Sequence, residues 1–140
     1  MPFKVIGAPW IKADDFAIKL NALQLPGVTF VPYHFQPFYG RYKGEDCHGV
    51  LLNITNSHTY RPLYVQYLLL GMLKSLYPKE FQEKIKAMAA SKKELFCKAN
   101  GNEEMWKLLS SPKEIAWQMI LFQKEEREHF KQKRKRYLLY

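Results

Sequence analysis

The sequence FVPYHFQPFYGRYKGEDCHGVLLNITNSHTYRPLY (residues 30–64) contains the densest aromatic run of the chain and three of its four histidines. Its outer parts are typical of strands. Residues 28–35 carry β-branched and aromatic side chains, and residues 49–55 form a compact apolar run between turn residues. The middle, residues 36–48, is too rich in proline, glycine and charge to be a strand throughout. The pattern therefore predicts two strands joined by a long loop, and such loops often carry binding residues.

The side chains of this stretch favour binding. The aromatic faces of Tyr39 and Tyr42 suit sugar rings, whose C–H faces are apolar. Arg41 and Arg61 can hold a carboxylate through paired hydrogen bonds, and Glu45 can accept hydrogen bonds from hydroxyl or amide groups. Two alternatives stay open. One is an ordinary long hairpin whose aromatics complete the core, and the other is that the arginines form structural ion pairs, such as Arg41 with Glu45.

The sequence shows no complete catalytic or metal-binding set. It has no GxSxG, HExxH, P-loop or GxGxxG motif, and Cys47 and Cys97 lack the spacing of a zinc motif. Cys47 is expected to be a small buried residue, because neighbours such as Cys47 and His48 point to opposite faces of an extended chain. His34 is expected to be half-buried with its hydrogen bonds satisfied. We therefore predict no catalytic residue, no metal and no cofactor.

A formal net charge of +9 is the unusual bulk property of these 140 residues. It fits an anionic partner such as nucleic acid, a membrane surface or an acidic glycan. The excess is concentrated near the C-terminus, where basic residues also suit the end of a helix. These residues are Lys131, Lys133, Arg134, Lys135 and Arg136. The sequence lacks the aromatic signature of an RNA-recognition sheet and the pattern of a helix-turn-helix, and its apolar runs are too short to span a membrane.

The rest of the chain predicts an α+β fold with an α/β-like start. A short strand at 3–6 and an amphipathic helix at 13–23 precede the first long strand, in the order of a βαβ unit. Further helices are expected at 62–76, 79–88, 103–109 and from Ser111 onward, with a lysine-rich link at 91–93 and a turn at 98–102. We predict one domain, residues 1–140, in which a sheet of about three strands packs against four to five helices.

Several motifs resemble one bacterial family, in order and with matching gaps. They are IGAPWI (6–11), LNALQLPGVTF (20–30), FQPFYGRYKGEDCHGV (35–50), NIT followed by YRP (53–55 and 60–62), and RKRYLLY (134–140). The family was long catalogued as a domain of unknown function and is associated with exo-β-N-acetylmuramidases of peptidoglycan recycling. Each motif is weak alone, and the ordered set across the chain carries the resemblance.

The resemblance implies a two-domain glycosidase whose Rossmann-like N-terminal domain carries the catalytic glutamate. This chain resembles the C-terminal domain, and a strand that follows Met1 directly fits that interpretation. The domain is expected to close the cleft, to bind N-acetylmuramic acid and to be inactive alone. The residues expected to bind substrate are Tyr39, Arg41, Tyr42, Glu45 and Arg61. Within the loop, the residues that depart from the family pattern are Tyr39, Gly40, Lys43 and Asp46.

The expected partners follow from the same resemblance. They are the N-terminal catalytic domain and a glycan that contains N-acetylmuramic acid, in a parent protein of the bacterial periplasm or exterior. The face that the missing domain would cover predicts a homodimer. An alternative of a different class is a stand-alone basic module that binds nucleic acid or another anionic polymer, for which the C-terminal basic cluster is the support.

Overall fold

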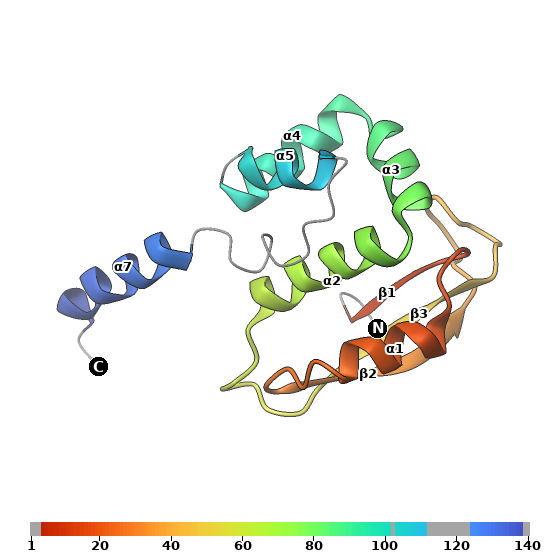
Figure 1. Ribbon diagram of the computed structural model, residues 1–140. Coiled ribbons are helices and arrows are strands. Elements are labelled where there is room, and N and C mark those ends of the chain that lie inside the picture. Colours follow the sequence, from red (N-terminus) through yellow and green to blue (C-terminus); the bar gives the residue numbers. More distant parts are fainter. Residues whose placement is uncertain (1–3, 102, 112–123, 139–140) are drawn as a thin grey trace. The chain divides into compact units, whose positions relative to one another are not determined.

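The computed structural model describes residues 4–101, 103–111 and 124–138 (Figure 1). The chain divides into two compact units, Met1–Pro62 and Leu63–Tyr140, and each is described by itself. The α+β class is confirmed, with a three-stranded antiparallel sheet and, in the described ranges, six α-helices. This is at least one helix more than the expected four to five, and the single domain predicted for residues 1–140 stays a prediction.

The first unit contains the whole sheet. Its elements are β1 (Val5–Ala8), α1 (Ala13–Asn21), β2 (Val28–Phe35) and β3 (Cys47–Ile54), and the strand order is β1-β3-β2. Because β1 and β2 each pair antiparallel with β3, they run parallel to each other. The predicted βαβ order is therefore present, with β3 inserted between its two parallel strands.

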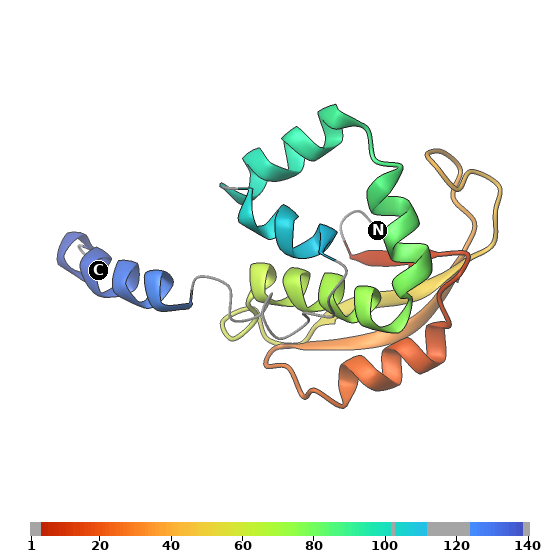
Figure 2. The same ribbon diagram turned by 45° about the horizontal axis from the view of Figure 1, so that its top comes forward.

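Helix α1 packs against β2 and β3 (Figures 1 and 2). Side chains alternate across a strand, so Phe30 of β2 and Val50 of β3 lie on one face of the sheet. Both are buried, as are the apolar positions of α1, namely Ala13, Phe16, Ala17 and Leu20. These side chains recur at helical spacing, which explains why residues 13–21 form an amphipathic helix over this face.

Strand β2 lies at an edge of the sheet, where backbone groups lack a second strand. The side chain of Asn21, the last residue of α1, fills this role at Phe30. Its Nδ2 donates to the Phe30 carbonyl at 2.8 Å, and the Phe30 N–H donates to its Oδ1 at 2.9 Å. Pro32 is tolerated in β2 for the same reason, because an edge strand does not need every N–H for pairing.

Glycines allow β1 and β3 to approach closely. Gly7 and Gly49 are cross-strand partners, and a Cβ on Gly49 would collide with the Ile6 carbonyl oxygen. A Cβ on Gly7 would lie 2.6 Å from the Phe35 ring, which in turn stacks on Tyr33 with centroids 5.7 Å apart. Two predicted strand limits are therefore wrong: β1 does not end at Ile6 but continues through Gly7 to Ala8, and β3 starts at Cys47, two residues before the predicted start at Gly49.

The second unit is helical. It contains α2 (Pro62–Leu76), α3 (Pro78–Lys86), α4 (Ala90–Asn100), α5 (Glu104–Ser110), α7 (Lys124–Arg134) and the short 3-10 helix η1 (Lys135–Tyr137). Helices α2 to α5 follow one another through short connections (Figure 2). Helix α2 is buried on nearly all sides, with Val65, Leu68, Leu69 and Leu73 in the core. The Tyr67 hydroxyl donates to Asn100 Oδ1 at 2.8 Å and so ties α2 to the end of α4.

One feature of this unit differs from the sequence prediction. Residues 90–100 form helix α4, where a link and a turn were expected, and Gly101 ends it with a left-handed φ of 77°. The helix predicted from Ser111 onward lies outside the described residues at 112–123, and its described continuation is helix α7. Phe130 of α7 is 63% exposed, and Tyr137 and Leu138 near the end of the chain are exposed as well.

Candidate functional site

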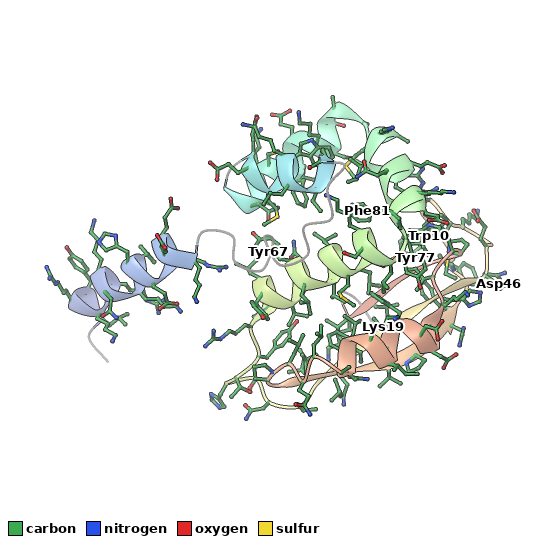
Figure 3. All side chains as sticks on the ribbon, viewed as in Figure 1. Trp10, Lys19, Asp46, Tyr67, Tyr77 and Phe81 are labelled. Atoms are coloured by element: carbon green, nitrogen blue, oxygen red, sulfur yellow. The ribbon has the colours of Figure 1, made fainter. Side chains whose placement is uncertain are left out.

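The candidate site is the loop of residues 36–46, which joins the two long strands. Phe35 ends β2, Cys47 begins β3, and these two residues are cross-strand partners. Both strands lead into the loop from a paired ladder, so its two ends are fixed side by side. The loop projects beyond the end of the sheet, and Trp10 and Asp46 lie at that same end (Figure 3).

The neck of the loop is closed by hydrogen bonds. The Gly44 N–H donates to the Pro37 carbonyl at 3.0 Å, and Gln36 Nε2 donates to the Gly44 carbonyl at 3.0 Å. Gly44 has a φ of 77°, a conformation that favours glycine because it has no Cβ. Beyond the neck, the Glu45 N–H donates to the Tyr42 carbonyl at 3.0 Å. The chain between Pro37 and Gly44 is therefore a tied turn with its ends held together.

The tip of the loop presents aromatic side chains to solvent. Phe38 and Tyr39 are 91% and 86% exposed. Tyr42 is half-buried, and its hydroxyl accepts a hydrogen bond of 3.4 Å from Trp10 Nε1 in the β1–α1 connection. Phe38 and Tyr39 at the tip thus do not complete the core, whereas Phe30 of the same stretch does, as the hairpin alternative required. Tyr39 offers an open ring face, whereas Tyr42 also anchors the loop.

Arg41 and Glu45 are both exposed on this loop. Within the described residues neither forms an ion pair, so the structural Arg41–Glu45 pair that the sequence left open is not formed. The Arg41 guanidinium is therefore available for an external carboxylate, which it can bind through two parallel hydrogen bonds. The loop combines an exposed aromatic face, a cation and a hydrogen-bond acceptor within seven residues, Tyr39 to Glu45.

Arg61 does not join this group. It follows the segment 55–60, which packs on Gly27 at the start of β2 through Asn56 and Thr59. The loop precedes β3 and Arg61 follows it, so the eight residues of β3 place the two about 24 Å apart along the sheet. The prediction that Arg61 binds substrate stays a prediction, but the structure does not support one carboxylate clamp made by Arg41 and Arg61.

His34 and His48, which the sequence analysis did not pair, are in contact at the base of the loop. His34 and His48 are cross-strand partners, and their Nδ1 atoms lie 2.8 Å apart. His34 is exposed, whereas a half-buried side chain was expected. Hairpin counting from the Phe35–Cys47 pair would have found this contact. It was missed because the predicted strand began at Gly49.

Cys47 is a buried residue, as expected. Burial raises the pKa of its thiol, and the carboxylates of Glu45 and Asp46 raise it further. It is therefore a poor thiolate nucleophile. Cys97 is also a free cysteine and is half-buried. Across the parts of the chain that the structure describes, no cluster of three or more metal-ligating side chains occurs, and no helix is long and apolar enough to cross a membrane.

The basic cluster near the C-terminus is exposed on α7 and η1, where Lys131 pairs with Glu128 at 2.6 Å. A separate depression lies along α4, with a lining that includes Lys93, Cys97 and the ion pair of Glu94 with Lys98. Among the described residues, no aromatic side chain lines this depression. For a sugar ligand, the loop of residues 36–46 is the better candidate.

Comparison with known proteins shows the family of the chain. The family described as "Exo-beta-N-acetylmuramidase NamZ, C-terminal" matches residues 1–140. The chain is 37% identical over 81 residues to the peptidoglycan β-N-acetylmuramidase NamZ of Bacillus subtilis (strain 168), covering 58% of this chain and 20% of that protein. It is also similar to the crystal structure of a DUF1343 family protein from Bacteroides fragilis NCTC 9343, with a TM-score of 0.81 and 26% identity over 99% of this chain and 35% of that one. The chain thus spans between a fifth and about a third of these relatives.

Proposed function

Because the family matches its whole length, the chain belongs to the C-terminal family of the exo-β-N-acetylmuramidase NamZ, and we propose that it forms part of the substrate cleft of such an enzyme. The enzyme would release N-acetylmuramic acid from the ends of peptidoglycan fragments. The chain would bind the sugar and, as a minor part of a longer protein, would not hydrolyse it alone.

The observation that carries this proposal is the tied loop with its exposed Tyr39 and Arg41. N-acetylmuramic acid differs from N-acetylglucosamine by a lactyl group that ends in a carboxylate. An aromatic face can stack on the sugar ring, and a guanidinium can bind that carboxylate. Both groups project from one short turn whose neck is closed, so little ordering is needed when the ligand binds.

The chemistry of hydrolysis would come from elsewhere in the enzyme. Glycosidases of the common kind use a carboxylic acid to protonate the leaving oxygen. Glu45 of the loop is exposed, whereas the general acid of a glycosidase typically lies in an apolar pocket. We therefore assign Glu45 to hydrogen bonding and place the catalytic glutamate in the N-terminal domain. Since peptidoglycan lies outside the cytoplasmic membrane, we place the enzyme in the periplasm or outside the cell.

The test is to titrate the 140-residue chain with each sugar and to monitor the binding by two-dimensional NMR. N-acetylmuramic acid should shift the amide signals of residues 36–46. N-acetylglucosamine should bind about tenfold more weakly, because hydrogen bonds to a charged group contribute about 1.5–3 kcal/mol. Arg41→Ala should abolish this preference, and Tyr39→Ala should weaken the binding of both sugars.

Arg61→Ala is the matched control, since it removes the same charge at the other end of β3. Retained preference in this variant supports the loop as the site. Equal binding of the two sugars by the unmodified chain would overturn the proposal. Salt-sensitive binding of nucleic acid through α7, without any sugar binding, would instead support the alternative basic module.

A further inference from the structure

His34 and His48 form a pair of imidazoles held by the sheet. They are directly opposite each other on β2 and β3, with Nδ1 atoms 2.8 Å apart and ring centroids 5.0 Å apart. One Nδ1 donates its proton and the other accepts it, with the direction set by the tautomers. The contact is exposed to solvent. Two nitrogen lone pairs that share one proton can share a metal ion in its place.

If the two nitrogens keep their separation when a metal ion replaces the shared proton, that separation sets the angle at the metal. A metal–nitrogen distance of about 2.0–2.1 Å, combined with the observed 2.8 Å between the Nδ1 atoms, gives an angle at the metal of about 85–90°. A tetrahedral ion would instead need the nitrogens about 3.3 Å apart. Right angles between ligands belong to square-planar and tetragonal sites, which are typical of Cu²⁺ and Ni²⁺.

We propose that His34 and His48 form a two-histidine site for Cu²⁺, in which both Nδ1 atoms bind the ion at neighbouring positions. In the hydrogen-bonded pair the two Nδ1 lone pairs point at each other, so each ring must turn by roughly 45° to direct both lone pairs to one ion, which the broad χ2 minima of histidine allow. Within the described residues no third ligating side chain completes a cluster, so water fills the remaining positions. Among divalent first-row metals, Cu²⁺ forms the strongest complexes with such nitrogen ligands.

The strand pairing fixes the position of the two histidines in the sheet. Phe35 and Cys47, the next pair in the ladder, are the residues from which the loop of residues 36–46 departs. On β1 the partner of His48 is Ala8, a small buried residue. An ion bound to both histidines would therefore cross-link β2 and β3 at the base of that loop. The proposal is independent of the sugar-binding function proposed above.

The test uses the untagged 140-residue chain with Cys97→Ser throughout, because the half-buried free thiol of Cys97 would compete for copper. One equivalent of Cu²⁺ should give an axial EPR spectrum with splitting from two nitrogens. His34→Gln and His48→Gln should each lose the second nitrogen and bind at least about tenfold more weakly, since the second ligand acts at high effective concentration. His58→Gln is the control, because His58 is exposed in the segment after β3 and should leave binding unchanged.

A second measurement does not depend on the folding of any variant. Substoichiometric Cu²⁺ should first broaden the NMR signals of residues 33–35 and 47–49 in the unsubstituted histidine background. The proposal is overturned when the first signals to broaden surround His58 or His129. It is also overturned when either single histidine variant binds copper as tightly as the parent chain.

Discussion

Lys74 is a charged residue that is only 2% exposed, in the last turn of α2. Its Nζ donates to the Leu108 carbonyl at 2.7 Å, near the end of α5, where helix carbonyls lack partners of their own. Burial lowers the pKa of Lys74 from its ordinary value of 10.5. Lys74 therefore links two helices through one hydrogen bond while its charge is unfavourably placed.

This arrangement predicts a pH effect on stability. Below the lowered pKa, both the folded and the unfolded chain carry the charge, and the folded state bears the full burial penalty. As the pH rises from that pKa toward 10.5, the folded state loses its proton first, so the free energy of unfolding gains a favourable contribution. Lys74→Met should lack this gain. Urea unfolding should be measured near neutral pH and near pH 10.5. Between these two pH values, the free energy of unfolding of the parent should rise relative to that of Lys74→Met.

Lys107→Met is the matched control, because Lys107 is exposed on α5. Groups such as Tyr60 and Tyr67 titrate in all three proteins and cancel in the comparison. A difference between Lys74→Met and the parent that does not depend on pH would show that Lys74 is hydrated in solution.

Gly49 gives a second prediction for a single residue. Its hydrogen faces the backbone of β1, where a Cβ would collide with the Ile6 carbonyl. Gly49→Ala should therefore destabilise the chain by about 3 kcal/mol, at the upper end of typical overpacking costs. Gly40→Ala should cost only about 1 kcal/mol, because its φ of 92° is strained for alanine but nothing lies within 4 Å. Equal midpoints of thermal unfolding for the two variants would contradict the close approach of β1 and β3.

Gly7 and Gly49 show a distinction that local sequence patterns cannot make. A glycine beside an apolar run can mark a turn or a close contact between two backbones, and its local sequence is the same in both cases. Gly44 has positive φ in the predicted loop, and Gly101 has positive φ where it ends helix α4. Gly7 and Gly49 are contact glycines, and only the pairing of β1 with β3 shows this. The position of His48 in the ladder was missed because the predicted strand began one residue later, at Gly49.

Among the secondary-structure elements, the connection between α1 and β2 is the most open to test. Asn21 donates to and accepts from the backbone of Phe30, so it occupies both polar groups of an edge residue. Asn21→Ala should leave these groups to water and lower the free energy of unfolding by about 1–2 kcal/mol. Asn21→Asp keeps the acceptor for the Phe30 N–H but not the donor, so an intermediate loss is expected. Chemical denaturation measures both values, and an aspartate variant less stable than the alanine variant would contradict this view.

The elements themselves differ in how well the sequence predicts them. Strand β2 and helices α1 and α2 carry strong periodic or continuous apolar patterns, and their predicted limits agree with the structure to within two residues. Helix α4 has no buried residue, so it has no apolar stripe to find. Its sequence, ASKKELFCKAN, forms a helix through good helix formers and the i,i+4 pair of Glu94 with Lys98. Periodicity alone cannot predict such a helix.

At the scale of the whole chain, the loop between β2 and β3 was predictable from residue types, but its distance from Arg61 was not. The sequence places Arg61 only fifteen residues after Asp46, yet an intervening eight-residue strand separates the two in space. Helices keep such residues near each other, whereas an extended strand carries them apart. A binding site that includes Arg61 would therefore need a ligand longer than one sugar or a second contact region.

The proposed function makes a last prediction about the parent protein. If this chain supplies part of the cleft, then the separately produced N-terminal region should release a chromogenic group from an N-acetylmuramic acid glycoside only when this chain is added. Neither piece should be active alone, because one lacks the glutamate and the other lacks the positioning loop. With Arg41→Ala in this chain, the reconstituted activity should show a raised KM, with a loss of about tenfold in kcat/KM for one charged contact. Arg61→Ala should reconstitute normally for a monosaccharide glycoside.

Light scattering of the chain alone tests the predicted homodimer, and addition of the N-terminal region should replace that dimer by a one-to-one complex. Full activity of the N-terminal region by itself would rule out a cleft-forming role for this chain.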